Sequence, residues 1–131
     1  MPRRVHFVLP LALMLSAGSL SGCLLAAAGA GAAGAVAYSN RGATSDVALS
    51  VDSTFTRTLN AFSALKITET GRSTDDNGAT RRLTGKQGDI EVTVEMKRST
   101  PTMTKIEVVA RESAVDYDPD FAKTVLSRIL P

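Results

Sequence analysis

The fold of this chain is decided by the stretch Asp89-Ile90-Glu91-Val92-Thr93-Val94-Glu95-Met96-Lys97-Arg98. Apolar residues alternate with charged or hydroxyl-bearing ones, which is the pattern of a β-strand with one buried face and one face in water. An antiparallel sheet built from such strands needs a covering layer on its apolar face only. The stretch therefore predicts a half-exposed antiparallel sheet, and the flanking segments must supply the other strands and the cover.

Period-two patterns and turn signals on both sides extend this strand into a four-stranded antiparallel meander. The turn signals are rich in Gly, Asn, Asp and Pro, residues that adopt turn conformations at little cost. They are Asp75-Asp76-Asn77-Gly78, Gly85-Lys86-Gln87-Gly88 and residues 99–102. The predicted strands are residues 66–74, 79–85, 89–98 and 103–111. In the last strand we expect Ile106, Val108 and Ala110 to face inward.

Charge pairing predicts the register of the last hairpin. Pairing Val94 with Ile106 places Glu95 opposite Lys105. A slip by two residues sets Met96 opposite Ile106 and brings like charges face to face, at a cost of up to about 1 kcal/mol for each pair. We therefore predict the Val94–Ile106 register.

Amphipathic patterns predict one helix before the meander and one after it. Residues 46–65 carry apolar residues at spacings of three and four, with Asp46 or Ser45 as the N-cap. The last helix follows Asp118 as N-cap, with Pro119 at its first position. The predicted apolar faces are Val47, Val51, Phe55, Leu59, Phe62 and Leu65 in the first helix, and Phe121, Val125, Leu126, Ile129 and Leu130 in the second. The predicted fold class is α+β: helix, four-stranded antiparallel meander, helix, in a two-layer sandwich with both helices on one face.

The segment Leu20-Ser21-Gly22-Cys23 has the form of a lipobox, with an aliphatic residue and two small ones before a cysteine. Arg3, Arg4 and the apolar run 5–15 precede it, as in a secretory signal. That run is shorter than the roughly 20 residues needed to span a bilayer, which favours cleavage over retention. In bacterial lipoproteins, which this segment resembles, the cysteine is lipidated and becomes the first mature residue. We therefore predict a signal peptide over 1–22 and lipid attachment, including palmitate, at Cys23.

Residues 23–45 are predicted to tether a folded domain formed by residues 46–131. Residues 24–38 are almost all Ala and Gly, which fits either a flexible tether or a membrane-proximal helix. Polar residues 39–45 then form a linker. Leu24 follows the cysteine, and by the resemblance to lipoproteins the lack of Asp there favours the outer membrane, facing the periplasm.

Charge and composition exclude several classes of function. The chain has 15 Lys and Arg against 13 Asp and Glu, and loss of the signal peptide with Arg3 and Arg4 leaves the mature chain near neutral. Nothing in that balance favours nucleic acid as a partner. The only His is His6, in the signal, and the only Cys is Cys23. Ser/His/Asp and Cys/His nucleophile systems need such side chains, and their lack disfavours a catalytic zinc site, so we expect no enzyme, catalytic residue, metal or cofactor.

Two acidic groups have alternative interpretations. Asp116, Asp118 and Asp120 have the alternate spacing of a calcium loop, but no closing Glu follows, and helix capping is favoured. For Asp75 and Asp76 a solvated hairpin turn is favoured over a cation site.

Four basic residues lie around the first hairpins, and Arg81 shares the parity of the inward-facing Leu83. A solvated face is favoured over contact with anionic headgroups or an acidic partner. The four residues are Arg72, Arg81, Arg82 and Lys86.

The whole chain resembles a bacterial group of small lipoproteins known as domain of unknown function 3568. The matching features are the lipobox, the Ala/Gly run ending at Ala37-Tyr38, the amphipathic helix, the passage from Leu83-Thr84-Gly85 to Gly88-Asp89-Ile90-Glu91-Val92, and the closing helix through Ile129. The resemblance implies architecture and location but no activity.

The resulting expectation is a non-enzymatic envelope lipoprotein that acts by protein or lipid contact. The alternative is an accessory binding subunit of a larger envelope transport or secretion assembly. The expected partners are membrane lipid, through acylated Cys23, and an envelope protein; the residues set no oligomeric state.

Overall fold

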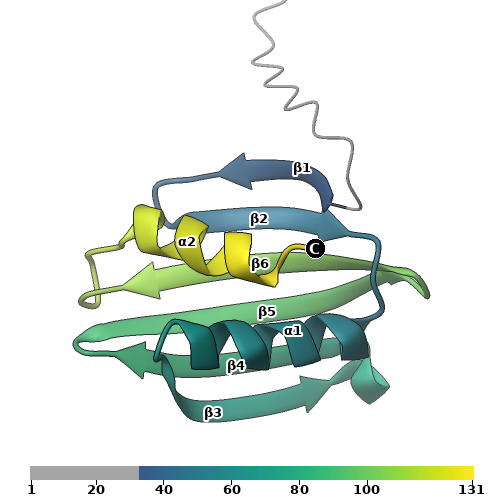
Figure 1. The fold of residues 1–131 in the computed structure, drawn as a ribbon, viewed down its shortest axis with the longest axis horizontal. Helices are drawn as coiled ribbons and strands as arrows, with labels where there is room; N and C mark the ends of the chain where they lie inside the picture. Colours follow the sequence, from purple (N-terminus) through teal and green to yellow (C-terminus); the bar gives the residue numbers. More distant parts are fainter. Residues whose placement is uncertain (1–32) are drawn as a thin grey trace, which may run out of the picture.

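The structure, a computed structural model, describes residues 33–131, which form two helices and one six-stranded antiparallel sheet. The strand order is β1-β2-β6-β5-β4-β3, and both helices lie on one face of the sheet (Figure 1). The strands are β1 (Ala33–Tyr38), β2 (Gly42–Val47), β3 (Thr68–Asp75), β4 (Thr80–Gln87), β5 (Ile90–Thr100) and β6 (Met103–Arg111), and the helices are α1 (Val51–Ala64), α2 (Pro119–Ile129) and a 3₁₀ turn, η1 (Asp76–Gly78). The predicted α+β class and the placement of the helices are confirmed.

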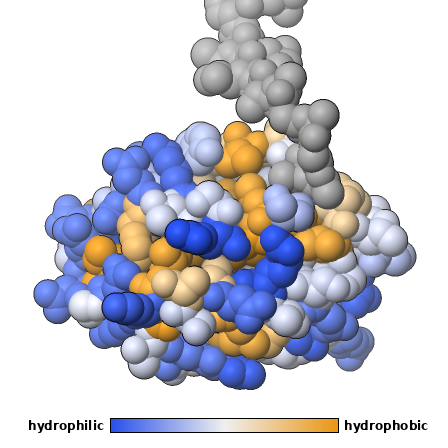
Figure 2. Space-filling view, viewed as in Figure 1, coloured by the Kyte–Doolittle hydropathy of each residue, from blue (hydrophilic) through white to orange (hydrophobic). Residues whose placement is uncertain are grey.

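The alternating stretch lies at the centre of this sheet as β5. Its inward residues Val92, Val94 and Met96 are fully buried, as predicted. Burying an aliphatic side chain of this size contributes about 1.5–3 kcal/mol. The same core contains fully buried residues from the neighbouring strands and α2, namely Leu83, Ile106, Val108, Ala110, Val125 and Ile129. On the helix-covered face, apolar residues show between the charged ones around the two helices (Figure 2).

The number of strands is the main correction to the sequence-based prediction. The tether predicted for residues 23–45 is wrong from residue 33 onward, because β1 and β2 form a hairpin that pairs with β6. The predicted domain boundary at residue 46 falls inside β2, where Ala43, Ser45 and Val47 are buried. Ala and Gly have low strand propensity, so these strands depend on pairing and burial rather than on a local signal.

The first helix begins later than predicted, and its N-cap is Ser50 rather than Asp46 or Ser45. The Ser50 hydroxyl accepts a hydrogen bond from the Ser53 N–H at 3.2 Å. Its buried face combines two of the predicted residues with two threonines and an alanine, while Phe55, Leu59 and Leu65 are only partly buried. The buried residues are Val51, Thr54, Thr58, Ala61 and Phe62.

Those two threonines satisfy their own polar groups. The Thr54 hydroxyl donates to the Ser50 carbonyl and the Thr58 hydroxyl to the Thr54 carbonyl, both at 2.9 Å. Both threonines are fully buried, and the Thr58 hydroxyl also contacts the Met96 sulfur at 3.4 Å. An apolar pattern alone therefore assigns this helix face incompletely.

The last helix agrees with its predicted cap. The Asp118 carboxylate accepts a hydrogen bond from the Phe121 N–H at 2.8 Å, and Pro119 occupies the first turn. Val125, Leu126 and Ile129 are buried as predicted, together with Ala122.

The predicted turns are confirmed in part. Residues 75–78 turn through η1, with Asn77 and Gly78 at positive φ. The turn predicted to start at Gly85 starts later, because β4 continues to Gln87. Gly88, at φ +60°, supplies the left-handed conformation that this two-residue turn needs.

The predicted register of the last hairpin is wrong. Met96, rather than Val94, pairs with Ile106, and Glu95 lies opposite Glu107. Both alternatives keep the apolar residues on one face, so burial does not distinguish them.

Each strand of this hairpin also pairs with a strand on its other side, and those pairings explain the observed register. Glu95 forms an ion pair with Arg82, its partner on β4. On the other side, Lys105 lies opposite Asp46 of β2. Like charges across β5 and β6 are thus offset by opposite charges on the outer strands, and the prediction treated the hairpin in isolation.

A guanidinium group joins the two helices. Arg57 on α1 donates through Nε to the Ile129 carbonyl at 2.6 Å and through its terminal nitrogen to the Leu130 carbonyl at 2.7 Å. These carbonyls lie at the negative end of the α2 dipole, so the contact combines hydrogen bonding with charge attraction.

We predict that Arg57→Ala lowers the free energy of unfolding by about 2–3 kcal/mol, because two charge-assisted hydrogen bonds are lost. Chemical denaturation measures the change. Arg98→Ala, at an exposed position near the end of β5, is the control and is expected to stay within about 0.5 kcal/mol of the original chain. Equal stability of the two variants would contradict the bridging role.

A second prediction concerns the pairing of β2 with β6. A Cβ at Gly42 would overlap the Val108 carbonyl oxygen, whereas a Cβ at Gly71 meets nothing within 4 Å. We expect Gly42→Ala to destabilise the domain by at least about 1–3 kcal/mol and Gly71→Ala to be neutral or slightly stabilising. Thermal unfolding of both variants provides the comparison. If Gly42→Ala is as stable as Gly71→Ala, residues 42–47 are not packed against β6 as described.

Candidate functional site

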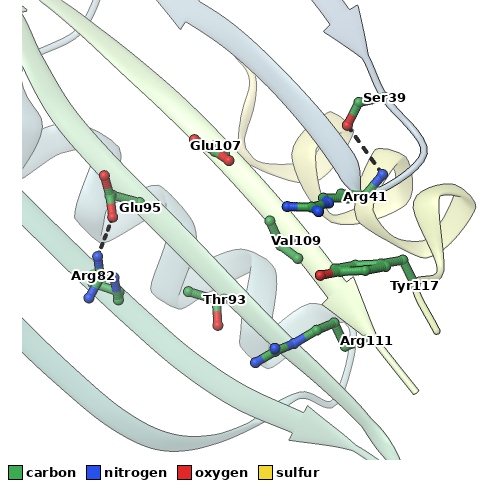
Figure 3. Close-up of a pocket in the computed structure, with 9 residues that line it drawn as sticks. All are labelled: Ser39, Arg41, Arg82, Thr93, Glu95, Glu107, Val109, Arg111 and Tyr117. Carbon is green, nitrogen blue, oxygen red and sulfur yellow. Dashed lines mark hydrogen bonds and ion pairs between the residues drawn. The ribbon is translucent and has the colours of Figure 1, made fainter. Parts of the chain in front are cut away.

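The sheet face that points away from the helices carries an open hollow of about 470 Å³, which we call the open-face basin. Arginine, glutamate and hydroxyl side chains surround one apolar residue in it (Figure 3). Its lining residues are Ser39, Arg41, Arg82, Thr93, Glu95, Glu107, Val109, Arg111 and Tyr117.

The floor of the basin is a direct result of strand alternation. Thr93 and Glu95 on β5, with Glu107 and Val109 on β6, occupy the positions between the buried core residues. Successive side chains of a strand point to opposite faces, so the burial of the core residues turns these four away from the helices.

The rim is built by two segments that lie far apart in the sequence. In the β1–β2 turn, the Ser39 hydroxyl accepts a hydrogen bond from the Arg41 N–H at 3.2 Å. Tyr117 is held beside β6 by a bridge to Arg111. The Arg41 guanidinium carbon lies 5.5 Å from the centroid of the Tyr117 ring, a cation–π contact that fixes both side chains over the hollow.

Two of the basin's cations have carboxylate partners. Arg82 pairs with Glu95, and this hydrogen bond raises the pKa of the Arg82 guanidinium. Arg111 pairs at 2.9 Å with Glu91, which lies outside the basin. Both pairs are partly exposed and are screened by solvent, so they position side chains more than they stabilise the fold.

The other two charged residues of the basin, Arg41 and Glu107, differ from these in their ion pairing. Within residues 33–131, neither Arg41 nor Glu107 has an oppositely charged side chain within 4.0 Å. The basin therefore offers a cation and an anion that are available to a ligand, beside the hydroxyls of Thr93 and Tyr117. Such an arrangement suits polar recognition.

The predicted lipid-attachment site cannot be compared with this geometry. The lipobox residues Leu20, Ser21, Gly22 and Cys23, and the signal peptide 1–22, lie outside the described residues. In the part of the chain that the structure describes, no helix is both long enough and apolar enough to cross a membrane.

The acidic residues around the start of α2 act locally, as the capping interpretation predicts. Asp118 caps α2, and Asp120 pairs with Lys123 at 3.0 Å. Asp116 accepts a hydrogen bond from the Ser113 hydroxyl at 2.9 Å. From residue 33 to residue 131 there is no group of three or more His, Cys, Asp or Glu side chains arranged to hold a metal ion.

The other acidic pair belongs to a turn. Asp76 lies in η1, and its carboxylate accepts a hydrogen bond from the Thr80 hydroxyl at 3.0 Å.

The basic residues of the first hairpins are divided between the two faces of the sheet. Arg81, with the inward parity noted in the sequence, pairs with Asp52 of α1 at 2.8 Å and stacks on Phe55 at 4.9 Å from its centroid. Arg72 also lies over the Phe55 ring. Of this group, Arg82 lines the basin, so the four do not form one basic surface.

Sequence reasoning missed most of the basin. The outward parity of Glu95 and Glu107 was readable from the alternation. No such signal marks Arg41 and Tyr117, because Arg41 lies in the predicted linker 39–45 and Tyr117 lies between the last predicted strand and the last predicted helix. Their approach depends on the pairing of β2 with β6, which no local pattern indicates.

Comparison with family models finds a match over most of the chain. The family model described as protein of unknown function (DUF3568) matches residues 6–111. The match includes every described strand and α1, and it ends at the last residue of β6, before Tyr117 and α2. No curated protein matches the chain.

Proposed function

The chain belongs to the family described as protein of unknown function (DUF3568), and from its residues we propose that it is a non-enzymatic bacterial envelope lipoprotein that binds a partner through the open face of its sheet. The proposal has two parts, an anchor at Cys23 and a contact surface at the open-face basin. Each part rests on different residues and has its own test.

The anchor is supported by the order of the first residues. A basic start, a short apolar run and the lipobox ending at Cys23 follow one another as in a lipoprotein signal. One acyl chain gives marginal attachment, whereas two or three make it stable, at about 0.8 kcal/mol for each buried methylene. We place the mature protein at the outer membrane, facing the periplasm, because by the resemblance to such lipoproteins the lack of Asp after the cysteine, where Leu24 stands, favours that membrane.

The anchor limits how far the domain can lie from the bilayer. Nine residues lie between Cys23 and Ala33, the first residue of β1, so ten residue steps join the two. An extended chain spans at most about 3.3–3.6 Å per residue, so β1 begins within about 36 Å of the attachment point. Contacts with molecules at or near the membrane surface are therefore the natural role for this domain.

The charged lining of the open-face basin is the observation that best supports binding of a partner. It includes a cation and an anion, Arg41 and Glu107, that have no ion-pair partner among residues 33–131, and it lies on the face that the two helices leave uncovered. A mature chain that starts at Cys23 retains no His, which leaves acid–base chemistry near neutral pH without its usual side chain. Recognition is therefore better supported than catalysis.

For the anchor we predict that Cys23→Ser abolishes acylation and releases the protein from the membrane fraction. The unchanged protein is expected to have the mass of residues 23–131 plus acyl chains. Intact-mass spectrometry and membrane fractionation of the native protein measure both effects. Ser21→Ala, which keeps a small residue in the lipobox, is the control and is expected to stay acylated. An unacylated protein that remains in the membrane would refute the anchor.

A second candidate function, an accessory subunit of a larger envelope assembly, is favoured by the edges of the sheet. Among the described strands, β1 lies at one edge and carries no charged residue, whereas β3 at the other edge carries Glu69, Arg72 and Asp75. Both edge strands have a register irregularity, so charge is what distinguishes them. Charged side chains oppose the addition of a further strand, and their absence from β1 leaves its backbone better suited than that of β3 to pairing with a strand of a partner.

If this second function is correct, a photocrosslinking residue at Ala35 in β1 will join the protein to a different envelope protein in intact cells. The same residue at Thr74 in β3 is the matched control and is expected to give no such product. Equal products from both positions, or none from Ala35, would exclude pairing through β1.

A further inference from the structure

The charges of the open-face basin are separated along one strand. Glu107, Val109 and Arg111 occupy successive outward positions of β6, at steps of about 7 Å. Arg41 is beside the Arg111 end, because Gly42 pairs with Val109 and Tyr117 with Arg111. The basin thus has a basic end and an acidic end, with an apolar residue between them.

The side chains converge on the middle of the basin rather than away from it. Figure 3 shows Arg41 and Tyr117 extending from the rim over Val109, and Arg111 extending toward Thr93. At the acidic end Glu95 is opposite Glu107 and is already paired with Arg82. Glu107 is therefore the carboxylate that a ligand would meet there.

We propose that the open-face basin binds a short zwitterionic peptide, with the peptide carboxylate at Arg41, beside Arg111, which also pairs with Glu91, and its terminal ammonium at Glu107. This inference deepens the proposed function and rests on it, because it names the class of ligand for the same surface. Arginine suits carboxylates, since its planar guanidinium donates two parallel hydrogen bonds to them. A glutamate near the far end provides the complementary acceptor for an ammonium group.

The size of the basin and the side chains that line it fit a peptide of two or three residues. An extended peptide of that length measures about 7–11 Å from end to end, which side chains leaning inward from backbone positions about 14 Å apart can meet. The volume of about 470 Å³ lies within the usual range for small-ligand sites. Val109 offers an apolar floor for small side chains, and the Thr93 and Tyr117 hydroxyls can hydrogen-bond to the peptide groups.

Charge complementarity distinguishes this ligand from simpler ones. A plain anion would meet Arg41 and Arg111 but would be repelled by Glu107 and Glu95. A ligand with only a positive charge would be attracted by Glu107 and Glu95 but repelled by Arg41 and Arg111. A ligand that carries both charges at its two ends avoids both conflicts.

The test is isothermal titration calorimetry of the full-length mature protein in detergent with trialanine and two capped forms. N-acetyl-trialanine lacks the ammonium group, and trialanine amide lacks the carboxylate. We expect free trialanine to bind with a dissociation constant on the order of 0.1–1 mM and each capped form to bind about three- to tenfold more weakly.

Substitutions assign each end of the ligand. Glu107→Gln is expected to remove the difference between free and acetylated trialanine while keeping the preference for the carboxylate. Arg41→Gln is expected to remove the difference between free and amidated trialanine. Lys97→Gln, on the same sheet face but outside the basin lining, is the control and is expected to change neither ratio.

Equal binding of free and capped peptides, binding of inorganic phosphate alone, or no heat with trialanine would each overturn the peptide site. None of these results affects acylation at Cys23, and loss of the anchor leaves the calorimetry interpretable. Failure of this inference is therefore distinguishable from failure of the anchor on which the proposed function rests.

Discussion

Antiparallel pairing of β6 with strands on both of its edges is the constraint on which the rest of the structure depends. Its inward residues Ile106, Val108 and Ala110 are fully buried under the helices, and its outward residues Glu107 and Val109 form the floor of the basin. Because side-chain direction has a period of two, a shift of β6 by one residue would exchange core and basin. The hydrophobic core and the basin thus depend on one register.

Strong local signals made half of this arrangement predictable. Strict alternation located β5 and β6, and an aspartate followed by proline located the start of α2. The strands β1 and β2 had no such signal, because Ala and Gly favour no strand and Gly42 is needed for its close approach to β6. The register failed for the same reason: Asp46 on β2 and Arg82 on β4 offset like charges that were judged on the last hairpin alone.

The candidate site was less predictable than the fold. Capping by Asp118 and the inward parity of Arg81 were readable because each depends on neighbours in the sequence or on strand parity. Arg41 and Tyr117 meet only after β2 has paired with β6, so no motif joins them. The lipobox cysteine Cys23 differs from these two residues, because it belongs to a specific motif but lies outside the described residues. Its acylation stays a prediction.

The central claim, that β6 pairs with β2 as well as with β5, is tested most directly by nuclear Overhauser contacts to Ile106 in solution. We expect cross-strand contacts from Ile106 to Ser45 on one side and to Met96 on the other, in agreement with the observed pairings. Contacts from Ile106 to Val94 without any to Ser45 would contradict both the register and the β1–β2 hairpin. The basin would then lose Arg41 from its rim.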